Sequence, residues 1–203
     1  MASLLHRRRP SPRPAASVAA AHAVADAHLV ARAQADRAAF AAPYDRHFAG
    51  VYGYCYRELG SAERAEDAAQ QVFAQALGSL PRYREQGRFR SWLYAIAHHV
   101  IAAQRRADRA DASLDALPEV ADARASPEDQ ALGSLARGDL LAAVARLPAD
   151  QRRVVALRIA GLKGREIAEV LGRSHEAVRM LQHRALARLG ASLVPPRGGR
   201  DDA

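Results

Sequence analysis

The side chains best suited to chemistry lie between residues 161 and 189, where basic residues recur along a segment with helical spacing. The segment indicates two short helices joined by a tight turn at Gly172, because glycine adopts a positive φ without steric penalty. Ser174 follows the turn, and its hydroxyl can accept a hydrogen bond from a free N–H of the next helix. This pattern is typical of a helix-turn-helix, a unit whose second helix can enter a DNA major groove.

The second of these helices has an apolar face and a partly basic face. One face would dock on neighbouring helices while the other meets DNA. The alternative is an ordinary helical hairpin with a solvated charged face, and the sequence favours DNA binding over it. The apolar stripe comprises Val178, Leu181, Ala185 and Leu189, and the opposite face comprises Glu176, Arg179, Met180 and His183.

A second candidate site combines aromatic and basic residues between Arg88 and Tyr94. Aromatic rings stack on unpaired bases while arginines hold the backbone, and each stacked base contributes about 1–3 kcal/mol. Trp92 fits this role and equally fits the core of a small helical bundle. The adjacent His98 and His99 point about 100° apart on a helix and cannot bind one metal ion together. One of them faces DNA, or both lie on an exposed polar face.

Other functional classes find little support. No paired catalytic carboxylates, glycine-rich phosphate loop, nucleophile–base set or metal-ligand spacing occurs, so we expect no enzyme activity, cofactor, metal or small-molecule substrate. Cys55 is the single cysteine and cannot form an intramolecular disulfide. No apolar run approaches the roughly 20 residues of a membrane span. Prolines and polar residues break the signal-like start, so we expect a cytoplasmic protein without membrane insertion.

Charge divides the chain into blocks. The net charge is +8 and the pI about 10.5, which favours an anionic partner such as nucleic acid. Two basic blocks, residues 82–109 and 152–188, flank an acidic block of six acids and one arginine at residues 110–131. That block also contains prolines and predicts a linker. The expected organisation is a disordered basic tail (1–23), a first domain (24–109), the acidic linker (110–131), a second domain (132–193) and a disordered tail (194–203).

Helical periodicity dominates outside the linker, so we predict an all-α fold of two small helical domains. Pro43 should kink the second helix or shift its start, because proline removes a backbone donor. A helix should begin at Ser126-Pro127, end near Leu147-Pro148 and be followed by another that closes at Gly161. The expected helices of the first domain span residues 24–35, 37–59, 62–79 and 89–108.

Four segments in the expected order resemble the extracytoplasmic-function (ECF) sigma factors, a two-domain class of the sigma-70 family of RNA polymerase initiation subunits. DAHLVARAQADRAAFAAPYDRH at residues 26–47 resembles the opening of the family's first domain. AEDAAQQVFAQAL at 65–77 resembles its polymerase-binding helix, and FRSWLYAIAHHVIAAQRR at 89–106 its promoter-melting segment. Residues 147–189 resemble the fourth region, which reads the -35 element. The chain is thereby identified as an alternative sigma factor.

The resemblance implies binding to core RNA polymerase, at the clamp coiled coil of the largest subunit and at the flap, to promoter DNA and to an anti-sigma factor. Its alternative is a helix-turn-helix regulator that acts without being a polymerase subunit. Polymerase contacts are assigned to Asp67, Gln70, Gln71 and Phe73, although Phe73 could instead lie in the core. Contacts with the -10 element are assigned to Arg88, Arg90, Trp92, His99, Arg105 and Arg106. Contacts at -35 are assigned to Arg152, Arg153, Lys163, Arg173, His175, Glu176, Arg179, His183 and Arg184.

Overall fold

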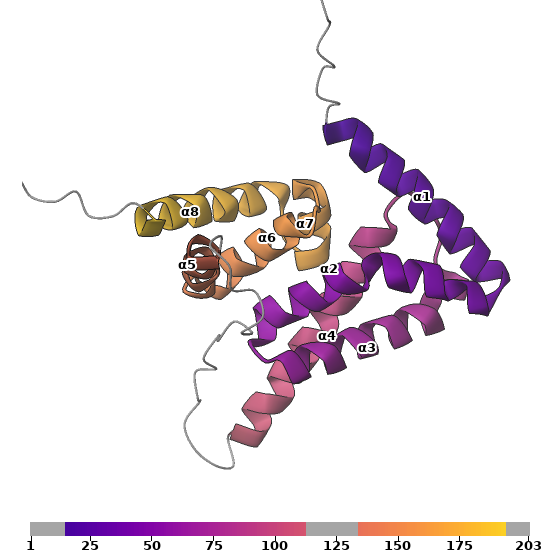
Figure 1. Cartoon of the computed structure of the whole chain (residues 1–203), viewed down its shortest axis with the longest axis horizontal. Helices are drawn as coiled ribbons and strands as arrows, with labels where there is room; N and C mark the ends of the chain where they lie inside the picture. Colours follow the sequence, from indigo (N-terminus) through magenta and orange to yellow (C-terminus); the bar gives the residue numbers. More distant parts are fainter. Residues whose placement is uncertain (1–14, 113–133, 194–203) are drawn as a thin grey trace, which may run out of the picture.

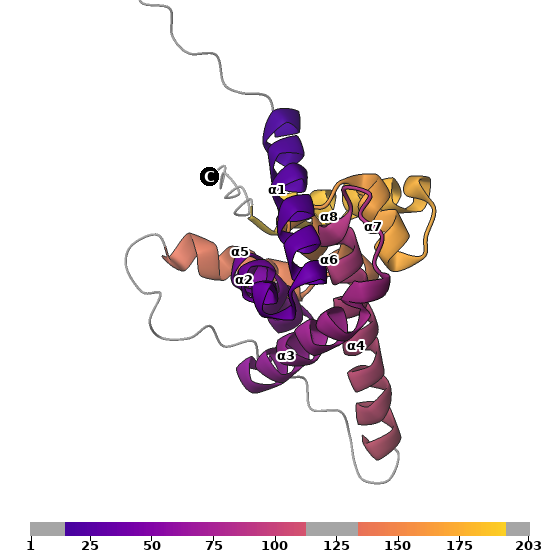
Figure 2. The same cartoon turned by 90° about the vertical axis from the view of Figure 1, so that its right-hand side faces the viewer.

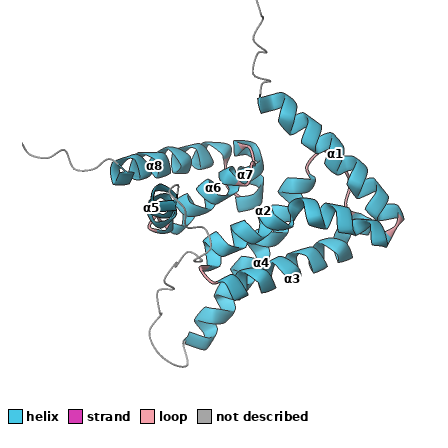
Figure 3. Cartoon of the chain, viewed as in Figure 1, coloured by secondary structure: helices cyan, strands magenta, loops and turns pink. Residues whose placement is uncertain are grey.

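The computed structural model describes residues 15–112 and 134–193, and every regular element in those two ranges is a helix (Figure 3). The all-α expectation is confirmed. We call residues 15–112 the first unit and residues 134–193 the second unit. The predictions for the acidic linker, for a helix start at Ser126-Pro127 and for a C-terminal disordered tail lie largely or wholly outside the described residues.

The first unit begins earlier than the sequence suggested. Its first helix starts at Ala15, so residues 15–23 belong to a helix and the prediction of a tail there is wrong. Prolines before Ala15 predict a break in helical structure, but the alanine-rich stretch that follows them has high helix propensity. Pro43 shifts the start of the next helix, where it lies in the first turn. The elements are α1 (Ala15–Ala35), η1 (Arg37–Phe40), α2 (Ala41–Leu59), α3 (Ala62–Ser79), η2 (Leu80–Arg82) and α4 (Phe89–Ala112).

Local capping explains the sharp boundaries of these helices. The Asp36 carboxylate accepts a hydrogen bond from the Ala38 N–H at 2.9 Å and starts η1. Gly60 ends α2 with φ at 73°, a conformation that favours glycine. The Ser61 hydroxyl then accepts from the Arg64 N–H at 3.3 Å and starts α3. A two-residue connection between α2 and α3 forces these helices to pack side by side.

The second unit contains the predicted helix-turn-helix. Gly172 has φ at 60° and separates the last two helices, and the Ser174 hydroxyl accepts a hydrogen bond from the Ala177 N–H at 3.1 Å. Val178, Ala185 and Leu189 of the apolar stripe are buried as predicted. The elements are α5 (Ser134–Ala145), α6 (Ala149–Ile159), α7 (Gly164–Leu171) and α8 (His175–Leu193).

The two units lie against each other rather than apart. In both Figure 1 and Figure 2 the orange helices α6 and α7 lie beside the first unit, where α7 packs on α4 and α6 contacts α2. Val154, Leu157 and Ile167 belong to the same contiguous apolar cluster as the core of the first unit. The contact therefore positions several predicted DNA-binding residues of each unit against the other. No helix among the described residues has the length and apolar character that crossing a bilayer requires.

Candidate polymerase and promoter interface

The outer face of α3 presents the acidic and amide side chains predicted to bind a protein partner. Asp67, Gln70 and Gln71 are exposed. The opposite face of the helix is made of small apolar residues that allow close packing on α2 and α4. These buried residues are Ala65, Ala68, Ala69, Val72 and Ala76.

Phe73 does not share that outer face. Its side chain is only 3% exposed, and its ring contacts those of Phe40, Tyr44 and Phe48 at centroid distances of 6.4, 4.7 and 6.1 Å. The assignment of Phe73 to the polymerase surface is therefore corrected. Four aromatic rings exclude water from this position, and burial of so large a ring outweighs any gain from leaving it exposed.

The start of α4 carries an aromatic cluster with arginines on its edge. Phe89 is buried, whereas Trp92 is half-buried and contacts Tyr83 and Phe89 at ring-centroid distances of 4.7 and 5.5 Å. Trp92 is thus both packed against the aromatic cluster and partly accessible. Arg88 is exposed, yet both Arg88 and Arg90 contact the second unit here. The Arg88 guanidinium lies 3.1 Å from the Glu169 carboxylate, and Arg90 donates a hydrogen bond to the Gly161 carbonyl at 3.4 Å.

The two adjacent histidines of α4 occupy different environments. His98 is half-buried, and its Nδ1 lies 3.4 Å from the Tyr54 hydroxyl. Burial, together with the nearby Arg153, lowers the pKa of His98 to about 4, so the ring is neutral at pH 7. His99 is exposed, as is Arg106 about two helical turns further along the same face. Of the two histidines, His99 is the more exposed.

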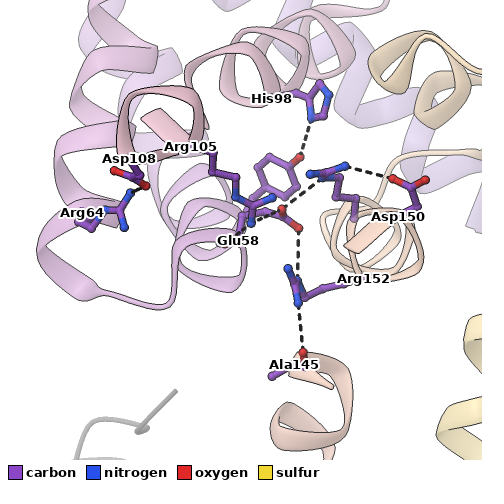
Figure 4. A network of polar contacts seen from close by, with 10 residues as sticks. Glu58, Arg64, His98, Arg105, Asp108, Ala145, Asp150 and Arg152 are labelled. Carbon is purple, nitrogen blue, oxygen red and sulfur yellow. Dashed lines mark hydrogen bonds and ion pairs between the residues drawn. The ribbon is translucent and has the colours of Figure 1, made fainter. Parts of the chain in front are cut away.

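A fully buried carboxylate lies where the two units meet (Figure 4). The Glu58 side chain has no exposed surface, and its oxygens lie 2.9 Å from Arg105, 3.5 Å from Arg153 and 3.9 Å from Arg152. Arg105 also donates a hydrogen bond to the Glu58 carbonyl, and Arg152 donates one to the Ala145 carbonyl at 3.1 Å. Burial raises the pKa of Glu58, and the three arginines act against that rise.

Sequence reasoning overlooked Glu58 and placed its three arginine partners at DNA. The side chains of those arginines are between 19% and 26% exposed, so the structure holds them inside the contact between the units. One feature of the sequence does indicate that Glu58 is buried and paired. Glu58 follows Tyr54 by one helical turn and thus continues the buried face of α2, where an acid without a partner would be strongly disfavoured.

The outward face of α8 remains open. Glu176 and Arg179 are 64% and 70% exposed and form an ion pair with each other at 2.8 Å. Arg173 lies beside this face and pairs with Asp150 at 2.6 Å. The exposed side chains on or near this surface also include Lys163, His175, His183 and Arg184. All four helix-turn-helix residues predicted to face the groove, Arg173, Glu176, Arg179 and His183, therefore lie on accessible surface.

Other chemistry has little support among the described residues. Within residues 15–112 and 134–193, no three His, Cys, Asp or Glu side chains gather in a way that could hold a metal ion. Cys55 is buried, and that burial raises the pKa of its thiol to about 12. The thiol is therefore unreactive near neutral pH.

Comparison with known proteins matches both units to regions of one protein family. Residues 43–110 match the model of sigma-70 region 2, and residues 137–189 match that of sigma-70 region 4. The chain is also 41% identical over 154 residues to the ECF RNA polymerase sigma factor SigD of Mycobacterium tuberculosis, which covers 71% of this chain and 72% of that protein. The chain belongs to the ECF sigma factors. It is a non-catalytic subunit that directs promoter recognition by RNA polymerase.

Other relatives support the same family assignment. The ECF sigma factor ShbA of Streptomyces griseus is 43% identical over 150 residues, covering 68% of this chain and 78% of the relative. BldN of Streptomyces coelicolor is 37% identical over 172 residues, covering 82% of this chain and 65% of the relative, just under two thirds. The sigma factor RpoE of Bartonella quintana, solved with an anti-sigma factor, shares the fold with a TM-score of 0.68 at 18% identity, over 76% of this chain and 96% of that chain.

The family assignment decides between the two functional alternatives. A helix-turn-helix regulator that acts without polymerase has no need of sigma region 2, which here spans α2, α3 and α4. The sigma factor assignment is therefore confirmed, and promoter binding through the helix-turn-helix of region 4 with it.

Proposed function

We propose that this ECF sigma factor docks on core RNA polymerase through the outer face of α3. The support is the exposure of Asp67, Gln70 and Gln71 on a helix whose other face is fully packed. Because α3 is rigidly held between α2 and α4, its carboxylate and amide groups keep a constant spacing. Such a surface suits an arginine-rich partner, and the expected partner is the clamp coiled coil of the polymerase largest subunit.

Region 2 would then hold the unwound -10 strand along α4. Trp92 offers a partly accessible ring, while His99 and Arg106 are exposed on the same helix. A stacked base and a few phosphate contacts suffice to offset separation of base pairs, which costs about 1.4 kcal/mol per step. Arg88 and Arg90 would join them once they leave their contacts with the second unit, and Arg105 would do so once it leaves Glu58.

Region 4 would read the -35 element with α8. Glu176, Arg179 and His183 lie on its exposed face and can reach base edges, whereas Lys163 and Arg184 would meet phosphate. Base contacts specify a sequence and phosphate contacts position the protein on it. Arg152 and Arg153 would contribute phosphate contacts after release from Glu58.

The expected cellular setting follows from this role. Core polymerase and promoters reside in the cytoplasm, so we place the protein there. We also propose a protein inhibitor of the anti-sigma type, supported by the Bartonella quintana structure, whose sigma factor is bound by an anti-sigma factor.

Transcription in a reconstituted system tests the proposal. Core polymerase would be incubated with the full chain and a pool of templates whose -35 and -10 positions are randomised, and the transcripts would be sequenced. We expect transcripts only when both proteins are present, with enriched bases at two elements. Arg179→Ala should alter the enriched bases at -35 alone. Enrichment that is unchanged by Arg179→Ala would contradict the assignment of α8 to base reading.

A further inference from the structure

Three cationic side chains from both units converge on one carboxylate. Arg105 comes from the first unit, and Arg152 and Arg153 come from the second, yet all three lie within 3.9 Å of the Glu58 oxygens. Figure 4 shows this arrangement, with Arg105 approaching from α4 and Arg152 from the opposite side. Each of the three arginines was assigned to DNA from the sequence.

A second contact between the units involves the start of α4. Arg88 pairs with Glu169 of α7 at 3.1 Å, and Arg90 donates to the Gly161 carbonyl at 3.4 Å. Both arginines were also assigned to DNA. The two units therefore bind each other through the same side chains that each would use on the promoter.

We propose that Glu58 takes, on Arg152 and Arg153, the place of a DNA phosphate and thereby keeps the free sigma factor closed. Arg152 and Arg153 lie at ion-pair distance from the Glu58 carboxylate, and a guanidinium group attracts a phosphate through the same opposite charge. In the contact the Arg152 and Arg153 side chains are only 21% and 26% exposed, which leaves little of either for a DNA phosphate. DNA phosphate and Glu58 therefore compete for the second unit, and the two units must separate before region 4 can bind DNA fully.

The closed form depends on Glu58 because the groups around it are positive. Burial lowers the pKa of Arg105 and raises that of Glu58, which shows that both charges have lost hydration in the contact. Without the carboxylate, three guanidinium groups would face one another in a poorly hydrated space. In the separated form the same groups would be hydrated, so removal of the Glu58 charge destabilises the closed form selectively.

The remainder of the contact is mixed, because Val154, Leu157 and Ile167 join the apolar core of the first unit and polar groups lie beside them. A cleft of about 380 Å³ lies between the units and is lined by polar and charged groups that include Arg46, His47 and Arg90. Contacts within a chain that combine apolar and polar surface permit relative motion of the parts. The inference rests on the proposed phosphate role of Arg152 and Arg153, and it adds that the role is blocked in the free protein.

Separation of the units can be measured without DNA. Cysteines placed at the exposed positions Ala74 of α3 and Ala187 of α8 would carry a donor and an acceptor dye. The native Cys55 would stay unlabelled, because it is buried and its pKa is raised to about 12. We expect high energy transfer in the parent protein and a clear loss in Glu58→Gln. Glu63→Gln, the same change at an exposed position of α3, is the matched control and should leave transfer unchanged.

A second variant opens the contact from the other side. Glu169→Arg replaces an exposed ion pair with repulsion of Arg88 and leaves the buried groups in place. It serves where Glu58→Gln reduces folding, as judged by circular dichroism. Energy transfer that stays at the parental value in both folded variants would overturn the inference.

DNA binding supplies the second readout. The probe is a 30-base-pair duplex of arbitrary sequence, because phosphate contacts do not depend on sequence. Opening should raise affinity on the order of tenfold, since apparent affinity scales with the population of the binding-competent form. Release of two arginines should also steepen the dependence of log K on log salt by about 1.8, at about 0.9 per phosphate.

The outcomes separate this inference from the proposed function. Open variants that bind the duplex no better and with an unchanged salt slope would overturn phosphate competition, even if both still direct transcription with core polymerase. Open variants that bind DNA better but support no transcription would uphold the closed form and contradict the proposed promoter contacts instead.

Discussion

Phe73 offers the sharpest test of how the first unit is built, because the sequence assigned it to the polymerase and the structure places it in the core. Phe73→Ala removes a ring that is 3% exposed and contacts Phe40, Tyr44 and Phe48. Loss of a buried Phe side chain and the cavity left behind cost about 3–5 kcal/mol. We expect the free energy of unfolding to fall by that amount. For a domain of this size the melting temperature should fall by about 15 °C or more.

The measurement is urea unfolding of the full chain, followed by fluorescence of Trp92, the single tryptophan, which lies in the first unit. Gln70→Ala is the matched control, because Gln70 lies one turn away on the exposed face of α3. A surface change of this kind should alter stability by less than about 0.5 kcal/mol. If Phe73→Ala costs under about 1 kcal/mol and still abolishes polymerase binding, Phe73 is a contact residue and the packing described here is wrong.

Three further predictions concern the binding surfaces and pH. Asp67→Ala with Gln70→Ala should abolish association with core polymerase in native gels while leaving the circular dichroism spectrum unchanged; retained assembly would contradict the α3 assignment. On a promoter library at two salt concentrations, with core polymerase bound, Arg179→Ala should cost about 1–3 kcal/mol at particular bases, whereas Arg153→Ala should weaken all sequences alike and flatten the salt dependence; a uniform loss for Arg179→Ala would make it a phosphate contact. Because the pKa of His98 is lowered to about 4 in the folded protein, its contribution to stability is complete above pH 6.5 and is lost as the pH falls toward 4. Unfolding at pH 7 and pH 5 should differ by about 1 kcal/mol, after allowance for partial exposure, and His98→Gln should remove that difference.

Helices with explicit caps could be located from the sequence. The glycine and serine at residues 60 and 61 mark the end of α2 and the start of α3, and the turn at Gly172 marks the helix-turn-helix. These signals are local, since a cap depends on side chains within a few residues of the helix end. The start of α1 lacked such a signal, and prolines before Ala15 suggested a tail where alanine propensity supports a helix.

The candidate site could be predicted only where it is exposed. The accessible residues of α8 follow directly from helical periodicity, and so does the outer face of α3. Glu58 and its arginines could not be found this way, because Arg105 and Arg153 are 47 and 95 residues distant in the sequence and meet Glu58 only through the packing of two units. Phe73 was misassigned for a related reason: its three aromatic neighbours come from η1 and α2, outside its own helix.

Two buried carboxylates show how the same ion-pair chemistry serves different ends. Asp26 is 4% exposed and lies 2.7 Å from Arg46 and 3.1 Å from His47, all within the first unit. Burial acts to raise the pKa of Asp26, but His47 and Arg46 outweigh it and the pKa is lowered. The folded unit therefore favours the charged form, as expected of a permanent structural pair.

Glu58 behaves in the opposite way. Three arginines surround it, yet burial dominates and its pKa is raised. Keeping Glu58 charged in the contact costs desolvation free energy, and this cost disappears when the units separate and water returns to the carboxylate. A pair inside one unit can be optimised for stability alone, whereas a pair between units must also be releasable. In the closed form that we propose, Asp26 thus stabilises a single unit, whereas Glu58 holds the two units together until DNA phosphate competes for its arginines.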